Sequence, residues 1–214
     1  MKECNILSIF DFDKTLIRQD SFRLFGLLAS ESISKKVLVL LLALCNKIGF
    51  ISNKMYKELV LSFVWLTKDE KEKRFYLQKL FRELRRFENS EVIKLLNHHI
   101  KRGDGVVVIS ASPSFYLKPY VLFWSKDVEV FGSELQIVNG KIKFQNLYAI
   151  QKALCAKSII EQKRPSSVWV YTDHISDLPV IQLADRVRLV KPSAKLCDRL
   201  HQLNINYEII GVGV

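Results

Sequence analysis

Hydrophobic residues follow two patterns along this chain. Four short apolar runs predict buried parallel strands at 6–10, 105–112, 168–172 and 186–190. Between about Phe22 and Arg102 the chain contains no proline, and its apolar residues recur at helical spacing. This region predicts five helices: Phe22–Ala29, Lys35–Lys47, Asn53–Leu66, Lys68–Phe87 and Ser90–Arg102.

Strands and helices alternate again after residue 105. A hairpin is expected from Val128–Leu135 and Gln136–Phe144 around Asn139-Gly140, because Asn-Gly favours the tight turns that join antiparallel strands. An amphipathic helix running to about Gln162 and a closing helix at Ser193–Leu203 complete the pattern. The alternation predicts an α/β fold with a helical segment inserted between its first two strands.

Two carboxylates, Asp11 and Asp13, come directly after the first strand. Residues i and i+2 of an extended segment face the same way, so both side chains can reach one substrate. In open α/β sheets the ligand crevice lies at the carboxyl ends of the strands, where these residues stand. Like charges this close repel each other, and such a pair persists only if a divalent cation, a shared proton or a ligand offsets the repulsion.

The segment Asp11-Phe12-Asp13-Lys14-Thr15 resembles motif I of the haloacid dehalogenase superfamily, whose phosphatases carry Asp-x-Asp-x-Thr after their first strand. The resemblance implies that Asp11 is the nucleophile that becomes an aspartyl-phosphate. It also implies that Asp13 is the general acid and base and that Thr15 is one of the phosphate-binding residues. Taken alone, the motif has a plainer interpretation, a strand end that runs into a capped turn.

The second strand ends in Ser110-Ala111-Ser112, and this end resembles motif II of the same family. The resemblance implies that Ser110 donates its hydroxyl to a phosphoryl oxygen and that Ala111 binds the phosphate beside it. Ser112 has a structural alternative, because serine is a preferred N-cap and a helix is expected to start near Pro113.

Lys152, at the start of the amphipathic helix, matches the motif III lysine. In the family this lysine balances the negative charge of the nucleophile and of the transferring phosphoryl group. Lysines are common on helix faces, so Lys141 and Lys157 are rivals for the role.

The third predicted strand ends in Asp173 and Asp177, which are followed by a Leu-Pro pair. This end resembles motif IV, whose first acid binds magnesium. The resemblance implies one Mg²⁺ held by Asp11, Asp173 and the backbone carbonyl of Asp13, with Asp177 orienting Lys152 or the metal-bound waters. Mg²⁺ suits such a site because it takes few carboxylates and keeps several waters.

The family resemblance implies a Rossmann-like, three-layer αβα core with a parallel sheet, formed by residues 1–20 and 90–214. It implies an all-helical cap at 21–89. An insertion at this point is similar to that of the subfamily that includes phosphoserine phosphatases and a bacterial phosphatidylglycerophosphatase. In that subfamily the cap closes over the carboxylate pair, excludes water and selects the substrate.

Some positions depart from the family pattern. Lys14 stands where many members have Gly, and Thr172 replaces a frequent Gly or Ser before the metal aspartate. Asp20 stands where the phosphoserine phosphatases have a Glu that recognises the substrate amine, so we include it among the substrate-binding candidates. Their substrate-binding cap arginine has no evident counterpart in residues 57–66. These departures do not favour phosphoserine as the substrate.

The chain has 33 Lys and Arg against 22 Asp and Glu, a net charge of +11. A nine-residue apolar run, Val37–Cys45, spans only about 13 Å as a helix, against roughly 30 Å of bilayer hydrocarbon. Two interpretations of the run remain: an interfacial helix in peripheral contact with an anionic membrane, or the core of the cap. A nucleic-acid partner is not favoured, because no binding motif is present. Five lysines lie around the run: Lys35, Lys36, Lys47, Lys54 and Lys57.

No secretory leader precedes the first strand, and the four cysteines show no Cys-x-x-Cys spacing: Cys4, Cys45, Cys155 and Cys197. We therefore expect reduced thiols and a cytoplasmic protein, peripheral at the inner membrane surface if the interfacial helix exists. His98, His99 and His201 lack partners at metal-ligand spacing and are expected to be structural. His174 lies beside the proposed metal aspartate, where a structural role is favoured over substrate contact.

The leading hypothesis is a magnesium-dependent phosphomonoesterase that acts through an aspartyl-phosphate. Its favoured substrate is a phospholipid monoester such as phosphatidylglycerophosphate, and the alternatives are phosphoserine and sugar or polyol phosphates. A hypothesis of another class is a non-catalytic binding or regulatory module on the same fold, because a fold alone does not imply a function. The oligomeric state is not indicated by any pattern in the sequence.

Overall fold

A computed structural model describes residues 5–210 of the chain. Within this part, seven strands form one sheet in the order β4-β3-β2-β1-β5-β6-β7. Neighbouring strands are parallel except for β3 and β4, which are antiparallel. The strands are β1 (Ile6–Phe10), β2 (Gly105–Pro113), β3 (Val128–Val138), β4 (Lys141–Gln145), β5 (Ser167–Thr172), β6 (Arg186–Val190) and β7 (Glu208–Ile210).

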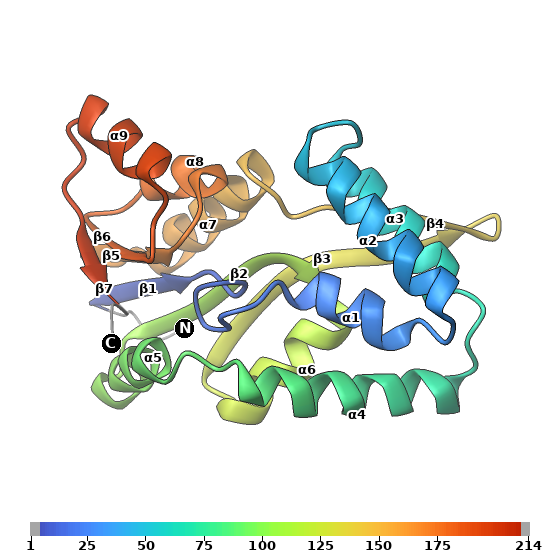
Figure 1. Cartoon of the computed structure of the whole chain (residues 1–214). Coiled ribbons are helices and arrows are strands. Elements are labelled where there is room, and N and C mark those ends of the chain that lie inside the picture. Colours follow the sequence, from blue (N-terminus) through green and yellow to red (C-terminus); the bar gives the residue numbers. More distant parts are fainter. Residues whose placement is uncertain (1–4, 211–214) are drawn as a thin grey trace.

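Helices cover both faces of this sheet (Figure 1). The alternation of side chains along β1 shows how the two cores arise: Leu7 and Ile9 pack under α7, α8 and α9, and Phe10 packs on the opposite face with α5 and α6. The result is a three-layer arrangement, and it confirms the expected α/β, Rossmann-like fold. These helices are α5 (Ser90–Arg102), α6 (Ser114–Trp124), α7 (Ile150–Lys163), α8 (Leu178–Ile181) and α9 (Ala194–Gln202).

Four helices are inserted between β1 and α5. Each starts after a side chain that accepts a hydrogen bond from the first turn, at Asp20, Ser32, Ser52 and Asp69. Gly26 in the first helix allows close packing, since an added Cβ would lie 3.0 Å from Val39 and 3.1 Å from Val60. The inserted helices therefore form a packed unit: α1 (Ser21–Ala29), α2 (Ile33–Lys47), α3 (Asn53–Val64) and α4 (Glu70–Arg86).

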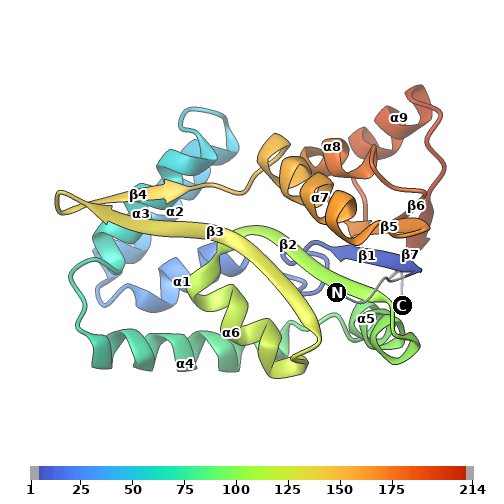
Figure 2. The same cartoon turned by 180° about the vertical axis from the view of Figure 1, so that it is seen from behind.

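The β3–β4 hairpin reaches beyond the rest of the sheet and runs beside α3 (Figure 2). Asn139 and Gly140 turn the chain with φ values of 50° and 69°, the left-handed backbone that a two-residue hairpin turn requires. The Glu58 carboxylate of α3 accepts a hydrogen bond from the Phe144 amide of β4 at 2.9 Å. This contact ties the inserted helices to the sheet near its carboxyl edge.

Most predicted elements are present, with informative differences at their ends. β3 continues to Val138, so the predicted boundary between the hairpin strands at residue 135 is wrong. α4 begins at Glu70 rather than at Lys68, because Asp69 and Glu72 form a capping box. β7 was not predicted, since its three residues carry too little pattern to identify a strand.

The apolar run in α2 is not a buried core segment. Val39 is the one buried residue of this helix, and the interpretation of the run as cap core is wrong for its outer face. Lys57, which we expected at the surface, is buried instead. No helix within residues 5–210 is long and apolar enough to cross a membrane. Four side chains of the run expose 48–53% of their surface: Val37, Leu40, Leu41 and Leu44.

Several cysteines and histidines lie away from the pocket described below. The described cysteines, Cys45, Cys155 and Cys197, are free thiols, while Cys4 and the start of the chain lie outside the described residues. His99 is buried in α5, where its ring nitrogens lie 2.7 Å from an Asp104 carboxylate oxygen and 2.8 Å from the Tyr171 hydroxyl. The contact with Asp104 gives His99 an acidic partner that sequence spacing did not indicate, and its position is structural.

Candidate active site

An open pocket with a cavity volume of about 170 Å³ lies at the carboxyl ends of β1, β2 and β5, with the inserted helices along its other side. This is the position where open α/β sheets bind their ligands. The sheet side contributes Asp11, Asp13, Lys14, Ser110, Ala111, Ser112, Tyr148, Lys152, Asp173, His174, Ser176 and Asp177. The inserted segment and its approach contribute Asp20, Phe22, Asn46, Asn53, Tyr56 and Lys57.

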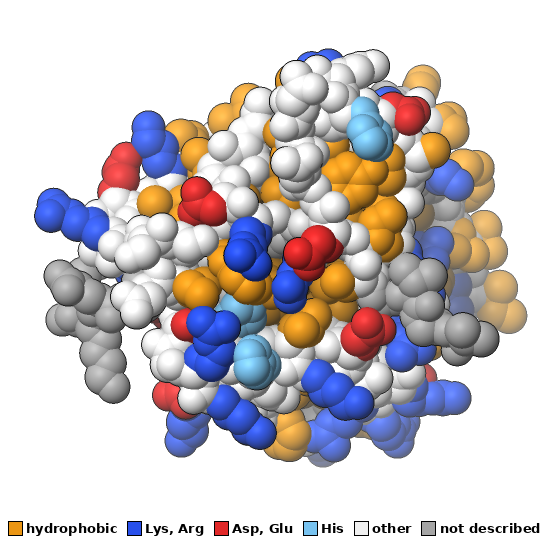
Figure 3. Space-filling model, turned by 90° about the vertical axis from the view of Figure 1, so that its left-hand side faces the viewer, with side chains coloured by type: hydrophobic (Ala, Val, Ile, Leu, Met, Phe, Trp, Pro, Cys, Tyr) orange, Lys and Arg blue, Asp and Glu red, His pale blue; other side chains and the backbone are white. Residues whose placement is uncertain are grey.

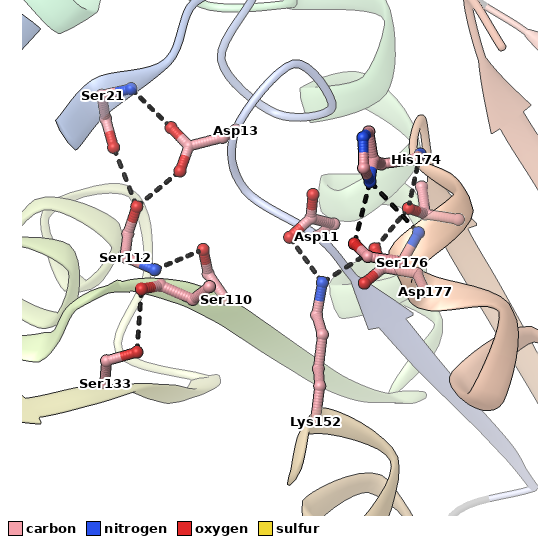
Figure 4. Close-up of polar contacts among 12 residues, drawn as sticks. Asp11, Asp13, Ser21, Ser110, Ser112, Ser133, Lys152, His174, Ser176 and Asp177 are labelled. Carbon is pink, nitrogen blue, oxygen red and sulfur yellow. Dashed lines mark hydrogen bonds and ion pairs between the residues drawn. The ribbon is translucent and has the colours of Figure 1, made fainter. Parts of the chain in front are cut away.

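Lys152 joins two carboxylates at the floor of the pocket (Figure 4). Its ammonium donates to Asp11 Oδ1 at 2.7 Å and to Asp177 Oδ2 at 2.9 Å. Burial alone would lower the pKa of Lys152, but the facing carboxylates of Asp11 and Asp177 raise it, so the side chain stays charged. Thr172 donates its hydroxyl to the same Asp177 oxygen at 2.5 Å. Lys152 is therefore the lysine that contacts Asp11, in preference to the alternatives Lys141 and Lys157.

The two alternative lysines, Lys141 and Lys157, lie away from the pocket. Lys141 begins the exposed end of β4, and Lys157 lies on the outer side of α7 with 63% of its side chain exposed. Neither residue lines the pocket.

Asp13 is held by hydroxyl and amide groups rather than by an ammonium. The Ser21 amide, at the start of α1, donates to its Oδ1 at 2.6 Å, and Ser112 Oγ donates to its Oδ2 at 2.5 Å. The hydroxyls of Ser21, Ser112 and Tyr116 form a chain, with Ser21 Oγ 3.0 Å from each of the other two. Burial raises the pKa of Asp13, and the neighbouring Asp20 adds to the rise, while the hydrogen bonds from Ser112 and Ser21 oppose it.

Ser112 therefore does not have the role that helix capping predicted. α6 begins after Pro113 and has no side-chain cap, while the Ser112 hydroxyl faces Asp13 instead. Ser112 belongs to the last residues of β2, beside the end of β1, in the stretch where the register of β2 with β3 shifts between Ile109 and Pro113.

The carboxyl groups of Asp11 and Asp173 are also strongly desolvated by burial. Burial raises the pKa of Asp11 to about 8, against the opposing effect of Lys152, and burial raises the pKa of Asp173 to about 7. Lys14 partly offsets the rise at Asp173, and its backbone has φ 58°, in the left-handed region where glycine is favoured. Among the described residues, no three His, Cys, Asp or Glu side chains form a ready metal cluster. The donors that face one another here are carboxylates, which suit a hard cation.

Of the other residues predicted to bind phosphate or substrate, three line the pocket and one, Thr15, does not. Ser110 lines the pocket, and its Oγ accepts the Ser112 amide at 3.1 Å, which leaves its hydroxyl proton for a ligand. Ala111 lines the pocket as well, and Asp20 does so while it caps α1 through the Arg23 amide. Thr15 is not brought into the pocket: it is fully buried, and its Oγ1 has no partner among the described residues.

His174 lies at the pocket wall, but its ring serves the local backbone. Nδ1 accepts a hydrogen bond from the Ser176 amide at 3.1 Å, at the start of a single 3₁₀ turn (Ile175–Asp177). Burial lowers the pKa of His174, which favours the neutral ring that this contact needs. The favoured structural role agrees with this geometry.

Lys57 is the charged residue among the pocket residues that sequence reasoning missed, which also include Phe22, Asn46, Asn53, Tyr56, Tyr148 and Ser176. It reaches from α3 across the pocket, where its ammonium donates to the Ala111 carbonyl at 2.5 Å and to Asn146 Oδ1 at 3.2 Å. Burial lowers its pKa to about 8, although Asp13, Asp20 and Asp11 favour the charged form. One signal was present: Lys57 lies on the apolar stripe of α3 that continues through Val60, Leu61 and Val64.

Comparisons with known proteins bear on the fold and on the family. Among solved structures, the chain is similar to a protein of unknown function from Bordetella pertussis Tohama I, with a TM-score of 0.83, 15% identity, and coverage of 96% of this chain and 98% of that one. It is also similar to a phospho-aspartyl intermediate analogue of phosphoserine phosphatase, with a TM-score of 0.70, 15% identity, and coverage of 97% and 94%. A substrate-bound phosphoserine phosphatase complex gives a TM-score of 0.71, 14% identity, and coverage of 99% and 94%.

At these identities the structural likeness establishes the fold. A comparison with curated protein sequences found no match. The family model of haloacid dehalogenase-like hydrolases matches residues 9–182. That segment is most of the chain and contains every residue that lines the pocket, so the chain belongs to the haloacid dehalogenase-like hydrolase family.

Proposed function

We propose that this hydrolase is a magnesium-dependent phosphomonoesterase that forms an aspartyl-phosphate on Asp11. The observation that carries the proposal is the different surroundings of the two carboxylates after β1. Asp11 faces the buried ammonium of Lys152, which opposes the rise that burial causes in its pKa, whereas Asp13 faces hydroxyl and amide donors and its pKa is raised further by the negative charge of Asp20. Two neighbouring carboxyl groups in unlike environments can act as a nucleophile and as an acid in one reaction.

In the first half of the reaction, an Asp11 carboxylate oxygen attacks phosphorus. Lys152 binds Oδ1, so Oδ2 is the oxygen left to attack. The new Asp11 O–P bond forms as the ester P–O bond breaks, and protonated Asp13 gives its proton to the leaving oxygen. The ammonium of Lys152 and the hydroxyl of Ser110 stabilise the charge that spreads over the phosphoryl oxygens.

In the second half, water attacks the phosphorus of the aspartyl-phosphate. Asp13, now ionised, takes a proton from this water, and the bond between Asp11 and phosphorus breaks. Inorganic phosphate leaves, and both carboxyl groups return to their starting states. The two hydrogen bonds to Asp13 hold it in place for both proton transfers.

The carboxylates of Asp11 and Asp173, with the carbonyl of Asp13, are the residues that would hold Mg²⁺. Their chemistry fits this ion, since it binds through few carboxylates and retains waters. Burial raises the pKa values of both Asp11 and Asp173, so their ionised forms are costly without a cation beside them. When bound, Mg²⁺ would reduce the repulsion between the nucleophile and the phosphoryl group.

We further propose that α1–α4, residues 21–89, act as a cap that selects the substrate. Lys57 and two asparagines, Asn46 and Asn53, face the pocket from this segment. A buried cation opposite the catalytic carboxylates favours an anionic group on the substrate. A phospholipid monoester such as phosphatidylglycerophosphate supplies that charge, and the exposed apolar face of α2 beside the pocket supports a lipid-borne substrate.

Phosphoserine is the second candidate substrate. The structural likeness to phosphoserine phosphatases supports it, as does the position of Asp20 in the pocket, where a carboxylate can face an amine. An assay of purified protein against phosphoserine, sugar and polyol phosphates, and lysophospholipid or phosphatidylglycerol phosphates separates the two candidates.

Replacing the nucleophile tests the reaction itself. Asp11→Asn should reduce p-nitrophenyl phosphate hydrolysis by roughly 10³-fold or more, because an amide is neither a carboxylate nucleophile nor an anionic metal ligand. Asp198→Asn changes an exposed carboxylate and should leave the rate unchanged. Chelation with EDTA should abolish wild-type activity, and Mg²⁺ should restore it.

Two results would contradict the proposed reaction. More than about one per cent residual activity in Asp11→Asn, with deamidation excluded by mass spectrometry, would remove Asp11 as the nucleophile. If the wild type releases no product with any of several divalent metals, a non-catalytic binding module becomes the better hypothesis.

Asp13→Asn tests the proton donor. It should slow alkyl phosphates by about 10²- to 10⁴-fold, because their leaving oxygens need a proton. In the first turnover, the loss should be much smaller for p-nitrophenyl phosphate, whose leaving group departs without a proton. Equal first-turnover losses for alkyl and aryl phosphates would show that Asp13 is not the general acid, since the later step that uses Asp13 as a base is common to both.

Lys57→Gln tests substrate binding from the cap. It should raise KM by about 10- to 100-fold with a smaller change in kcat, since it removes one charge-assisted hydrogen bond to the bound anion. Lys54→Gln is the matched control, one turn earlier on α3 with 57% of its side chain exposed. An unchanged KM in Lys57→Gln would exclude the role.

The pKa of Lys57 gives the same test a second readout. Burial lowers this pKa to about 8, so the ammonium is present below that pH and is lost above it. The wild-type kcat/KM should therefore fall above about pH 8 at saturating Mg²⁺. Lys57→Arg should keep its charge and lose this fall.

A further inference from the structure

The outer face of α2 carries an apolar stripe that nothing in the described chain covers. Six side chains expose 48–81% of their surface and recur at helical spacing: Ile33, Val37, Leu40, Leu41, Leu44 and Ile48. The opposite face of α2 packs into the hydrophobic core through Val39, Leu42 and Ala43. α2 is therefore apolar on both sides, which is unusual for a helix at a protein surface.

The charged residues within residues 32–57 are lysines, and the acidic residues at the two ends of this stretch, Glu31 and Glu58, pair with Lys35 at 3.5 Å and with Lys54 at 3.9 Å. Between Glu31 and Glu58 the chain contains five lysines and no acidic residue. Lys57 reaches into the pocket, which leaves four on the outside. Lys36 and Lys47 are exposed, and at 100° per residue they lie along the same edge of the stripe, next to Leu40.

Basic charge alone does not distinguish the outer face of α2 from the rest of the molecular surface. The other end of the molecule also carries many lysine and arginine side chains (Figure 3). What distinguishes the α2 face is the combination of a continuous apolar stripe, Lys36 and Lys47 at its edge, and no acidic residue between positions 32 and 57.

The stripe also adjoins the entrance of the pocket. Asn46 of α2 and Asn53 of α3 line the pocket, and the turn between these helices carries Ile48 and Phe50, which are 70% and 81% exposed. In Figure 1 this turn stands towards the top of the molecule, as do α7 and α8. A surface that covers the stripe and the turn would therefore lie against the pocket mouth.

We propose that the outer face of α2 and the α2–α3 turn dock this protein on an anionic lipid surface. The apolar side chains enter the region between headgroups and acyl chains, and Lys36 and Lys47 face the anionic headgroups. A second copy of the chain is a poorer occupant, because the same lysines would then face one another. The inference deepens the proposed function, since docking would bring a lipid-borne phosphate monoester to the pocket, but binding itself does not depend on catalysis.

Cosedimentation with vesicles tests the docking. The wild type should bind vesicles of phosphatidylcholine with about one third phosphatidylglycerol and should ignore pure phosphatidylcholine. Binding should fall as salt rises from about 0.05 to 0.5 M, because the Debye length shortens from roughly 14 to 4 Å.

Two sets of variants separate the apolar and basic contributions. Ile48→Ser with Phe50→Ser, and separately Lys36→Gln with Lys47→Gln, should each weaken vesicle binding by about tenfold or more. The matched controls lie at other surfaces: Phe123→Ser, at a side chain 70% exposed on α6, and Lys94→Gln with Lys101→Gln on α5. The controls should bind like the wild type, and every one of these proteins should hydrolyse p-nitrophenyl phosphate normally.

Other outcomes overturn the proposal. Failure of the wild type to bind anionic vesicles at low salt, or binding that the α2 variants leave unchanged, would exclude this face as the docking surface. A dimer in light scattering that Leu40→Gln with Leu44→Gln dissociates would show that a second copy covers the stripe. A wild type that binds vesicles but has no phosphatase activity would overturn the proposed function and leave the docking intact.

Discussion

The buried ammonium of Lys152 is the constraint around which the pocket is built. It lies between Asp11 and Asp177, residues separated from it by 141 and 25 positions in the chain, and its side chain is only 5% exposed. A charge at this depth is tolerated only with partners, and removing one partner of such a pair typically costs about 3–5 kcal/mol. The start of α7, the end of β1 and the turn after β5 are thus held in one arrangement, and Asp11 has one oxygen committed and one available.

Asp13, only two residues from Asp11, experiences the opposite environment. Among the described residues its hydrogen-bond partners are the Ser112 hydroxyl and the Ser21 amide, and Asp20 adds negative charge nearby. Burial raises the pKa of both carboxyl groups, but the ammonium of Lys152 opposes the rise at Asp11, whereas Asp20 adds to the rise at Asp13. The hydroxyl chain to Tyr116 links Asp13 to both α1 and α6, so the inserted helices and the core share in its placement.

Many residues of this pocket could be predicted from the sequence, because strand ends and short motifs are local patterns. Asp11, Asp13 and Asp173 follow the ends of predicted parallel strands, and the resemblance to the family's motifs added Lys152 at the start of a predicted helix. Lys57 was not predicted, because a lysine on a helix looks solvent-exposed unless its neighbours on the same face are known to be buried. The contacts of Ser112 with Asp13 and Ser21 span 99 and 91 residues, and no local pattern indicates contacts at such separation.

Trapping the covalent intermediate on Asp11 is the most direct measurement. An acyl phosphate in acid-quenched enzyme can be reduced with borohydride, which converts the phosphorylated aspartate to homoserine, and mass spectrometry then locates the change. During turnover of p-nitrophenyl phosphate we expect homoserine at position 11, with Asp13 and Asp173 unmodified and no such product in enzyme without substrate. Homoserine at another position, or steady turnover with no reducible intermediate at any time after mixing, would contradict nucleophilic catalysis by Asp11.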